Sequence, residues 1–209
     1  VPLFVGPVSE EADGNVLALP VLQELVRRHD LLMADESISR HFISHHYWMV
    51  QAEIRGPWGM AETVRMIMNR ESPVSQQIGW PGPSFSSATN ADLTEVLTRL
   101  FSIESVNGQK PYARFVSGLE QRDDGSWKAS AFYILGFANI NSLYGPEGQY
   151  SKVPGTEKPF FEEWERAIDR AYARSMAMTG EAVHVWSFLA LDSEVDDEVN
   201  QTLPLVGVS

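Results

Sequence analysis

The stretch 112–135, YARFVSGLEQRDDGSWKASAFYIL, decides the fold that this sequence predicts. Apolar and polar residues alternate in both of its halves, which is the two-residue period of a β-strand. Between the halves lies Asp123-Asp124-Gly125, and an Asp-Gly pair favours the tight turn of a β-hairpin. We therefore expect one hairpin near 112–135. A helix over Ser130–Asn139 is an alternative, because alanine and leucine are mixed there with aromatic residues.

On the N-terminal side of this stretch, the hydrophobic period changes to that of amphipathic helices. Apolar residues recur three and four positions apart, and capping residues such as serine, threonine, aspartate or asparagine precede several of these segments. The region 72–90 contains three prolines and two glycines, so we expect a long loop there. The expected helices are Leu17–His29, Ser37–Ile54, Met60–Asn69 and Ala91–Phe101.

On the C-terminal side, 141–159 is expected to be a second long loop. Phe160–Met178 carries the most regular helical pattern in the chain, and Gly180 is placed to end that helix. Ala182–Leu191 is expected to form a short strand or a buried helix. The segment 192–198 follows, with five carboxylates in seven residues.

These patterns together predict a mainly α fold of the α+β class, with one β-hairpin and extended arms at both ends. The expected domain organisation is an N-terminal arm (1–15), a single domain (16–191), and an acidic stretch with a C-terminal arm (192–209). With 209 residues, 44% of them apolar, the chain is long enough to bury a full core.

Composition excludes several classes of function. The formal net charge of −12 opposes general binding to nucleic acid or to anionic membranes. The sequence contains no cysteine, which excludes disulfides, thiolate catalysis and cysteine-ligated metals. No apolar run is long enough to span a bilayer, and no signal peptide is expected, so no membrane partner is expected either. The location is left open, with the cytoplasm or a virion expected if the protein is viral.

Histidines provide the one cluster with the spacing of metal ligands. His41 and His45 are four residues apart in the expected helix Ser37–Ile54, and Glu53 is a third candidate ligand. The spacing lacks the glutamate of an H-E-x-x-H zinc site, and buried, hydrogen-bonded histidines explain the pattern equally well. We therefore expect no bound metal and no cofactor. A helical metal-binding protein or enzyme centred on these three residues is the alternative.

No catalytic residue is expected, because no nucleophile elbow and no phosphate-binding glycine loop occurs in the sequence. Four arginines, together with nearby aromatic residues, could form a groove for single-stranded nucleic acid, although pairing with neighbouring glutamates is the more ordinary explanation. These arginines are Arg40, Arg55, Arg65 and Arg70. Trp80 and Phe85 lie in the expected loop 72–90, where they would be exposed unless they are docked. They suggest an adaptor that presents both rings to a partner, or simply a packed loop.

The two ends of the chain have similar sequences. PLFVGPVS at 2–9 matches PLVGVS at 204–209, apart from two insertions. Apolar ends need a docking site, either on their own domain or on neighbouring copies. Ends left by proteolysis of a longer precursor are a third possibility. We expect a self-associating structural subunit held by exchanged arms, such as a viral capsid or nucleocapsid protein, with copies of itself as partners. The expected contact residues are Leu3, Phe4, Val5, Leu205 and Val206, together with Trp80 and Phe85.

Overall fold

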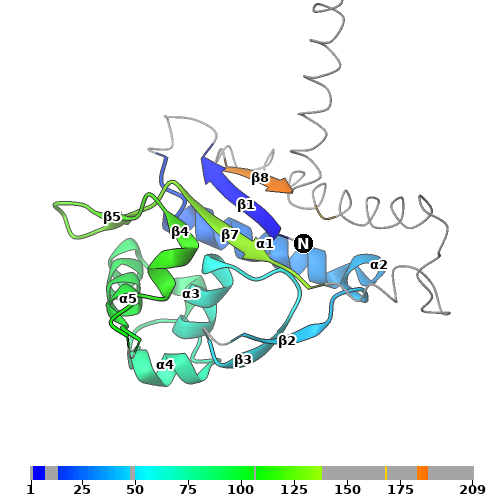
Figure 1. Cartoon of the computed structure of the whole chain (residues 1–209), viewed down its shortest axis with the longest axis horizontal. Helices are drawn as coiled ribbons and strands as arrows, with labels where there is room; N and C mark the ends of the chain where they lie inside the picture. The colour runs from blue at the N-terminus through cyan, green and yellow to red at the C-terminus, as the bar shows by residue number, and fades with distance from the viewer. Residues whose placement is uncertain are drawn as a thin grey trace, which may run out of the picture.

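The computed structural model of the chain describes residues 2–7, 14–47, 50–105, 107–137, 168 and 183–187 (Figure 1). This part of the chain is a mixed α+β structure, with five α-helices and several short antiparallel strands. The expected loop 141–159, the acidic stretch and the C-terminal arm lie outside the described residues. So does the expected helix Phe160–Met178, apart from Ile168, which is helical and buried.

Three of the helices form where the sequence predicts them. α1 (Leu19–Ala34) has Pro20 in its first turn and buries Leu22, Leu25 and Leu32. It ends five residues later than predicted, because its apolar stripe continues past the polar residues His29 and Asp30 to the buried Leu32. α3 (Met60–Met68) and α5 (Asn90–Ser102) agree closely with their predicted ranges. The Thr89 side chain accepts the backbone N–H of Asp92 and so caps α5.

The predicted helix Ser37–Ile54 is wrong. Only α2 (Glu36–Ser39) is helical in this region, and it is followed by a β-hairpin of β2 (Ser44–Tyr47) and β3 (Ala52–Arg55). The side chain of Asp35 caps α2 through the backbone N–H of Ser37, but capping starts a helix without extending it. The aromatic and β-branched residues further on fit a pleated strand better than a helix.

A short helix also lies within the region 72–90, where the sequence predicted a loop. α4 (Pro73–Ile78) starts after the N-cap Ser72 and ends at Gly79, which adopts a left-handed φ of 62°. A glycine in this conformation is a common helix stop, because it has no Cβ to clash. Arg99 of α5 donates hydrogen bonds of 3.0 Å to the carbonyls of Ile78 and Gly79, which secures the end of α4.

The hairpin predicted near 112–135 is confirmed, and it branches into two pairs of strands. Around the Asp123-Asp124-Gly125 turn, β5 (Glu120–Gln121) pairs with β6 (Trp127–Lys128). Next to this pair, β4 (Val116–Ser117) pairs with β7 (Ala131–Leu135). The alternative of a helix over Ser130–Asn139 is therefore wrong for the residues of β7. A 3-10 turn at Tyr112–Phe115 precedes β4. Together with β2–β3, the described part of the chain thus has more than the one hairpin that was predicted.

The main sheet joins segments from both ends of the described chain. Its strand order is β4-β7-β1-β8, where β1 is Pro2–Pro7 and β8 is Val183–Ser187 (Figure 1). β1 is antiparallel to both neighbours, with Phe4 opposite Tyr133 on one side and Trp186 on the other. The strand alternative for Ala182–Leu191 is therefore confirmed over 183–187.

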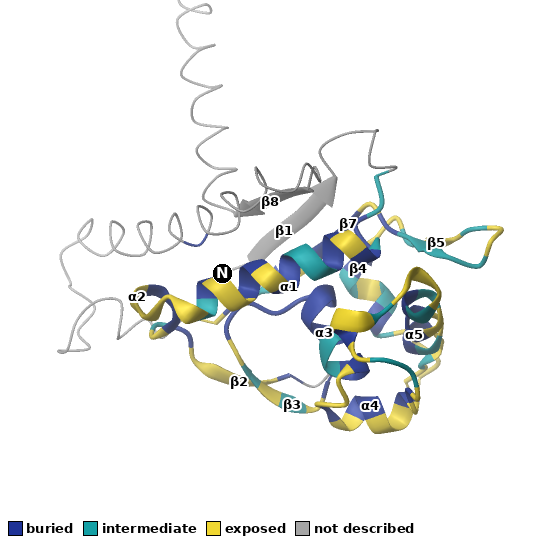
Figure 2. Cartoon of the chain, turned by 180° about the vertical axis from the view of Figure 1, so that it is seen from behind, coloured by how far each residue is buried: buried dark blue, intermediate teal, exposed yellow. Residues whose placement is uncertain are grey.

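The core lies where the helices meet the sheet, and Figure 2 shows the buried faces of α1, α3 and α5. α3 contacts α1, α5 and β7. Trp58 anchors the chain before α3 to the sheet, because its backbone N–H and carbonyl exchange hydrogen bonds of 2.7 and 2.8 Å with Leu135. The Trp58 side chain itself is 2% exposed.

Candidate functional site

The histidine candidates do not form the predicted helical pair. His41 follows α2 in a turn, whereas His45 lies on β2 opposite Ile54 of β3. Glu53 is opposite His46 in the same hairpin. Both are exposed. In the described part of the chain, no group of three or more His, Asp or Glu side chains could hold a metal ion.

His45 instead belongs to a group of aromatic rings. Its ring centroid is 4.5 Å from that of Phe137 and 5.7 Å from that of Tyr47. Tyr47 in turn packs against Trp58 at 4.2 Å, and its burial raises the pKa of its hydroxyl to about 12. His41 precedes the hairpin, and its partial burial together with the nearby Arg40 cation lowers its pKa. The ring contacts explain His45 as a packing residue of the hairpin.

Three of the four arginines hold the fold together through contacts within the chain. Arg55 donates hydrogen bonds to the carbonyls of Ser39 and Phe42, and Arg70 donates to the carbonyl of Pro81. Arg65 forms an ion pair of 2.6 Å with Asp30 of α1. The pairing expected with neighbouring glutamates is thus wrong for Arg65. Its partner lies on a different helix, which the linear sequence does not reveal.

The fourth arginine, Arg40, is exposed after α2, and its Nε donates to Nε2 of His41 at 3.2 Å. The predicted helix Ser37–Ile54 that contained Arg40 is absent. Arg40 follows α2, Arg55 lies on β3 and Arg65 lies on α3.

Trp80 and Phe85 are not presented to a partner. Each side chain is only 4% exposed, and both belong to the hydrophobic core. Trp80 donates its indole N–H to the carbonyl of Pro83, and the backbone N–H of Phe85 donates to the side chain of Asn69. An adaptor would need both rings at the surface, whereas their burial confirms the packed-loop interpretation.

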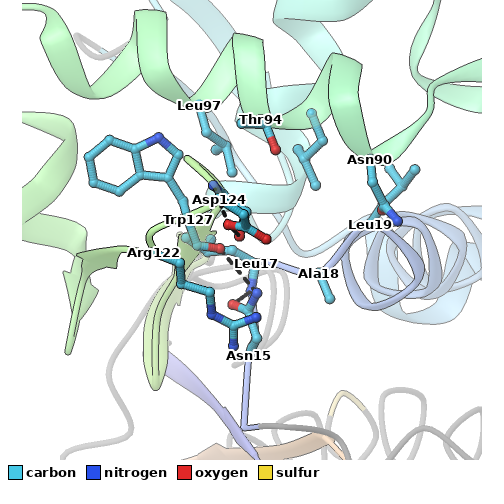
Figure 3. Close-up of a pocket in the computed structure, with 12 residues that line it drawn as sticks. Asn15, Leu17, Ala18, Leu19, Asn90, Thr94, Leu97, Arg122, Asp124 and Trp127 are labelled. Atoms are coloured by element: carbon cyan, nitrogen blue, oxygen red, sulfur yellow. Dashed lines mark hydrogen bonds between the residues drawn. The ribbon is translucent and has the colours of Figure 1, made fainter.

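Described residues line a pocket of about 340 Å³, here called the hairpin pocket (Figure 3). It lies between the start of α1, one side of α5 and the β5–β6 hairpin. Its apolar lining comes from buried leucines, and Trp127 forms one wall. The pocket is lined by Asn15, Leu17, Ala18, Leu19, Asn90, Leu93, Thr94, Leu97, Arg122, Asp124, Ser126 and Trp127.

The walls of the hairpin pocket are fixed by hydrogen bonds. The Asn15 carboxamide accepts the backbone N–H groups of Leu17 and Ala129 and donates to the carbonyl of Trp127. The Trp127 indole N–H donates to the Thr98 hydroxyl on α5 at 2.9 Å. The hairpin is thereby tied both to the start of α1 and to α5, so the pocket is part of the rigid fold.

The polar rim of the pocket carries one charge of each sign. Asp124 Oδ1 accepts the backbone N–H and the hydroxyl of Ser126, at 2.9 and 2.6 Å. These bonds, together with the nearby Arg122 cation, lower the pKa of the Asp124 carboxyl. It is therefore ionised at neutral pH. Arg122 lies on the other arm of the same turn and also lines the pocket.

In comparisons with known proteins, no family model matches this chain, and no curated protein matches it significantly. The described residues also contain no helix with the length and apolar character needed to cross a membrane. Proposals about function therefore rest on the residues and geometry of this chain alone.

Sequence reasoning missed the hairpin pocket altogether. Its residues come from three separate segments, 15–19, 90–97 and 122–127, and none of them forms a motif by itself. The one available signal was the charged turn Arg122–Asp124, but it was interpreted only as the tip of a hairpin. The pocket depends on how that tip folds against α5, and only the tertiary structure contains this information.

Proposed function

We propose that this protein is a self-associating structural subunit, whose copies are linked by exchange of the N-terminal strand. The observation that supports this proposal is the position of β1, which pairs through its backbone with β7 on one side and β8 on the other. Both partners are more than 120 residues away in sequence. Strand β1 of a second copy would make the same backbone hydrogen bonds with β7 and β8. Exchange therefore changes the free energy of strand pairing little.

The similarity of the two ends supports the same proposal. Residues 204–209 repeat most of the letters of 2–9, and the segment with these letters at the N-terminus forms a strand. A tail of like sequence suits strand addition to a sheet edge of a neighbouring copy. A viral capsid or nucleocapsid is one kind of assembly built in this way, and we propose it as the class of structure to which the subunit belongs.

Cysteine cross-linking tests strand exchange directly, because the natural chain has no cysteine. Phe4 and Tyr133 are opposite each other in the register of β1 and β7. Residues opposite one another in an antiparallel pair have Cα atoms about 4.5–5.5 Å apart, which is within the range of a disulfide. The double variant Phe4→Cys, Tyr133→Cys should therefore oxidise readily.

Under the proposal, oxidation of this variant in concentrated protein gives covalent dimers and larger species, which a reductant returns to single chains. The matched control is Val5→Cys, Tyr133→Cys. Position 5 is one residue out of register with Tyr133, and successive residues of a strand lie on opposite faces of a sheet, so this pair should cross-link poorly. If the Phe4 and Tyr133 pair forms only disulfides within one chain at every protein concentration, strand exchange is wrong.

A second measurement separates assembly from folding. Deletion of residues 1–9 should reduce the size of the assembly in light scattering, while far-UV circular dichroism still reports helices. Unchanged assembly size after this deletion would also contradict the proposal.

A further inference from the structure

The hairpin pocket combines an apolar floor with opposite charges on its rim, and no sequence motif or relative assigns it a ligand. We propose that it binds a free α-amino acid with an apolar side chain. This inference is independent of self-association, because none of the residues that carry it belongs to β1, β7 or β8.

The floor of the pocket determines the apolar part of the ligand. Leu17, Leu93 and Leu97 are each at most 5% exposed and belong to the main core, so core packing holds the floor in place. Trp127 stands beside them, held by its bond to Thr98 and packed against Phe101 with ring centroids 5.1 Å apart. A hydrocarbon or aromatic side chain placed here exchanges water for apolar surface.

The rim determines the polar part of the ligand. Asp124 and Arg122 are placed by one tight turn, in which Gly125 N–H donates to the carbonyl of Arg122 and Arg122 N–H to the carbonyl of Ser126. Figure 3 shows the Asp124 carboxylate and the Arg122 guanidinium among the residues around the same space. Ser126 donates both of its hydrogen bonds to Oδ1 of Asp124, and neither of them uses Oδ2.

A ligand with charge of only one sign fits this rim poorly. A simple amine would pair with Asp124 but also meet the Arg122 cation. A simple carboxylate would pair with the Arg122 guanidinium, but Asp124 and the net charge of −12 would repel it. An amino acid carries both an ammonium, which suits Asp124, and a carboxylate, which suits Arg122. A guanidinium has five donors, so Arg122 can bind a carboxylate while keeping its contacts within the chain.

The size of the pocket restricts the ligand to a single amino acid. Its volume of about 340 Å³ lies at the lower end of the range for small-molecule sites. Asp124 is exposed and Arg122 is half-buried, and ion pairs in contact with solvent contribute little to binding. We therefore expect the apolar side chain to supply most of the affinity, and the rim to select between ligands.

The test is an NMR titration of the full chain, in which the indole N–H of Trp127 and the amides of Asp124 and Ser126 are followed. The probes are L-leucine, L-phenylalanine, L-alanine and glycine. Leucine and phenylalanine should give saturable shifts at these positions, and affinity should fall about fourfold for each buried methylene that is removed. Two further probes, isoamylamine and 4-methylvalerate, each lack one charge of leucine and should bind about two- to fivefold more weakly.

Matched variants locate the binding site. Asp124→Asn should weaken leucine binding about two- to fivefold. Asp123→Asn changes the charge by the same amount at the neighbouring exposed position, which does not line the pocket, and should leave leucine binding unchanged. Circular dichroism checks that both variants fold. The proposal is wrong if neither leucine nor phenylalanine gives saturable shifts at millimolar concentration. It is also wrong if isoamylamine or 4-methylvalerate binds as tightly as leucine, or if the Asp124→Asn and Asp123→Asn variants bind leucine with the same affinity.

Discussion

Replacement of Asn15 by alanine should destabilise the protein more than any other change of an exposed or half-buried residue described above. Asn15 Oδ1 accepts the backbone N–H groups of Leu17 at 3.0 Å and Ala129 at 3.1 Å, and Nδ2 donates to Trp127 O at 3.0 Å. Leu17 and Ala129 are 1% and 0% exposed, so water does not replace the lost acceptor. An unsatisfied buried donor costs about 1–3 kcal/mol. With partial relaxation, we expect Asn15→Ala to lose about 2–4 kcal/mol.

Urea denaturation followed by tryptophan fluorescence measures this loss. For a slope of about 2 kcal/mol per molar urea, the midpoint should fall by about 1–2 M. The control is Asn90→Ala, at an exposed position that also lines the hairpin pocket, where we expect a change below about 0.5 kcal/mol. If Asn15→Ala lies within about 0.5 kcal/mol of the natural protein, the argument that Asn15 links the start of α1 to the hairpin is refuted.

Three further predictions concern a helix cap, a buried hydroxyl and a close contact. Thr89→Ala removes the acceptor that caps α5 and should cost about 1 kcal/mol in thermal unfolding, whereas Thr89→Ser should recover most of this loss. Burial raises the pKa of Tyr47 to about 12 from an unfolded value of 10.0, so its contribution to stability is complete below pH 10.0 and is lost as the pH rises towards 12. Tyr47→Phe should flatten this alkaline decline in urea titrations, and an unchanged decline would count against burial as its cause. Gly82→Ala would place its Cβ 2.2 Å from the Trp80 ring, so we expect a loss of about 1–3 kcal/mol, and a fully stable variant would contradict the close packing of Gly82 against that ring.

Local signals predicted some elements well. α5 was predictable within a residue at each end, because Thr89 provides a cap and four apolar residues lie on one face. α4 was equally marked by Ser72, Pro73 and Gly79, yet the many loop-forming residues around it obscured these signals. Such short helices depend on contacts from elsewhere, here from Arg99 of α5.

The error at Ser37–Ile54 has a different cause. The histidine and aromatic residues of this stretch have a spacing that fits either a helix or a pleated strand, and only their partners decide between the two. In the structure, Tyr47 packs on Trp58 and His45 on Phe137, and both partners lie outside the stretch itself. The metal hypothesis assumed a helical spacing of His41 and His45, which the structure does not have. For the same reason, the hairpin pocket could not be found before the tertiary contacts were known.

The strand order β4-β7-β1-β8 has a consequence for synthesis on the ribosome. β1 is made first, but its second neighbour, β8, begins 176 residues after β1 ends. At about 5–20 residues per second, one edge of β1 waits roughly 9–35 s for its partner. During that interval the open edge is available to nascent chains on the same messenger. The rate of translation thus sets how long neighbouring chains can compete for a strand before each sheet closes on its own.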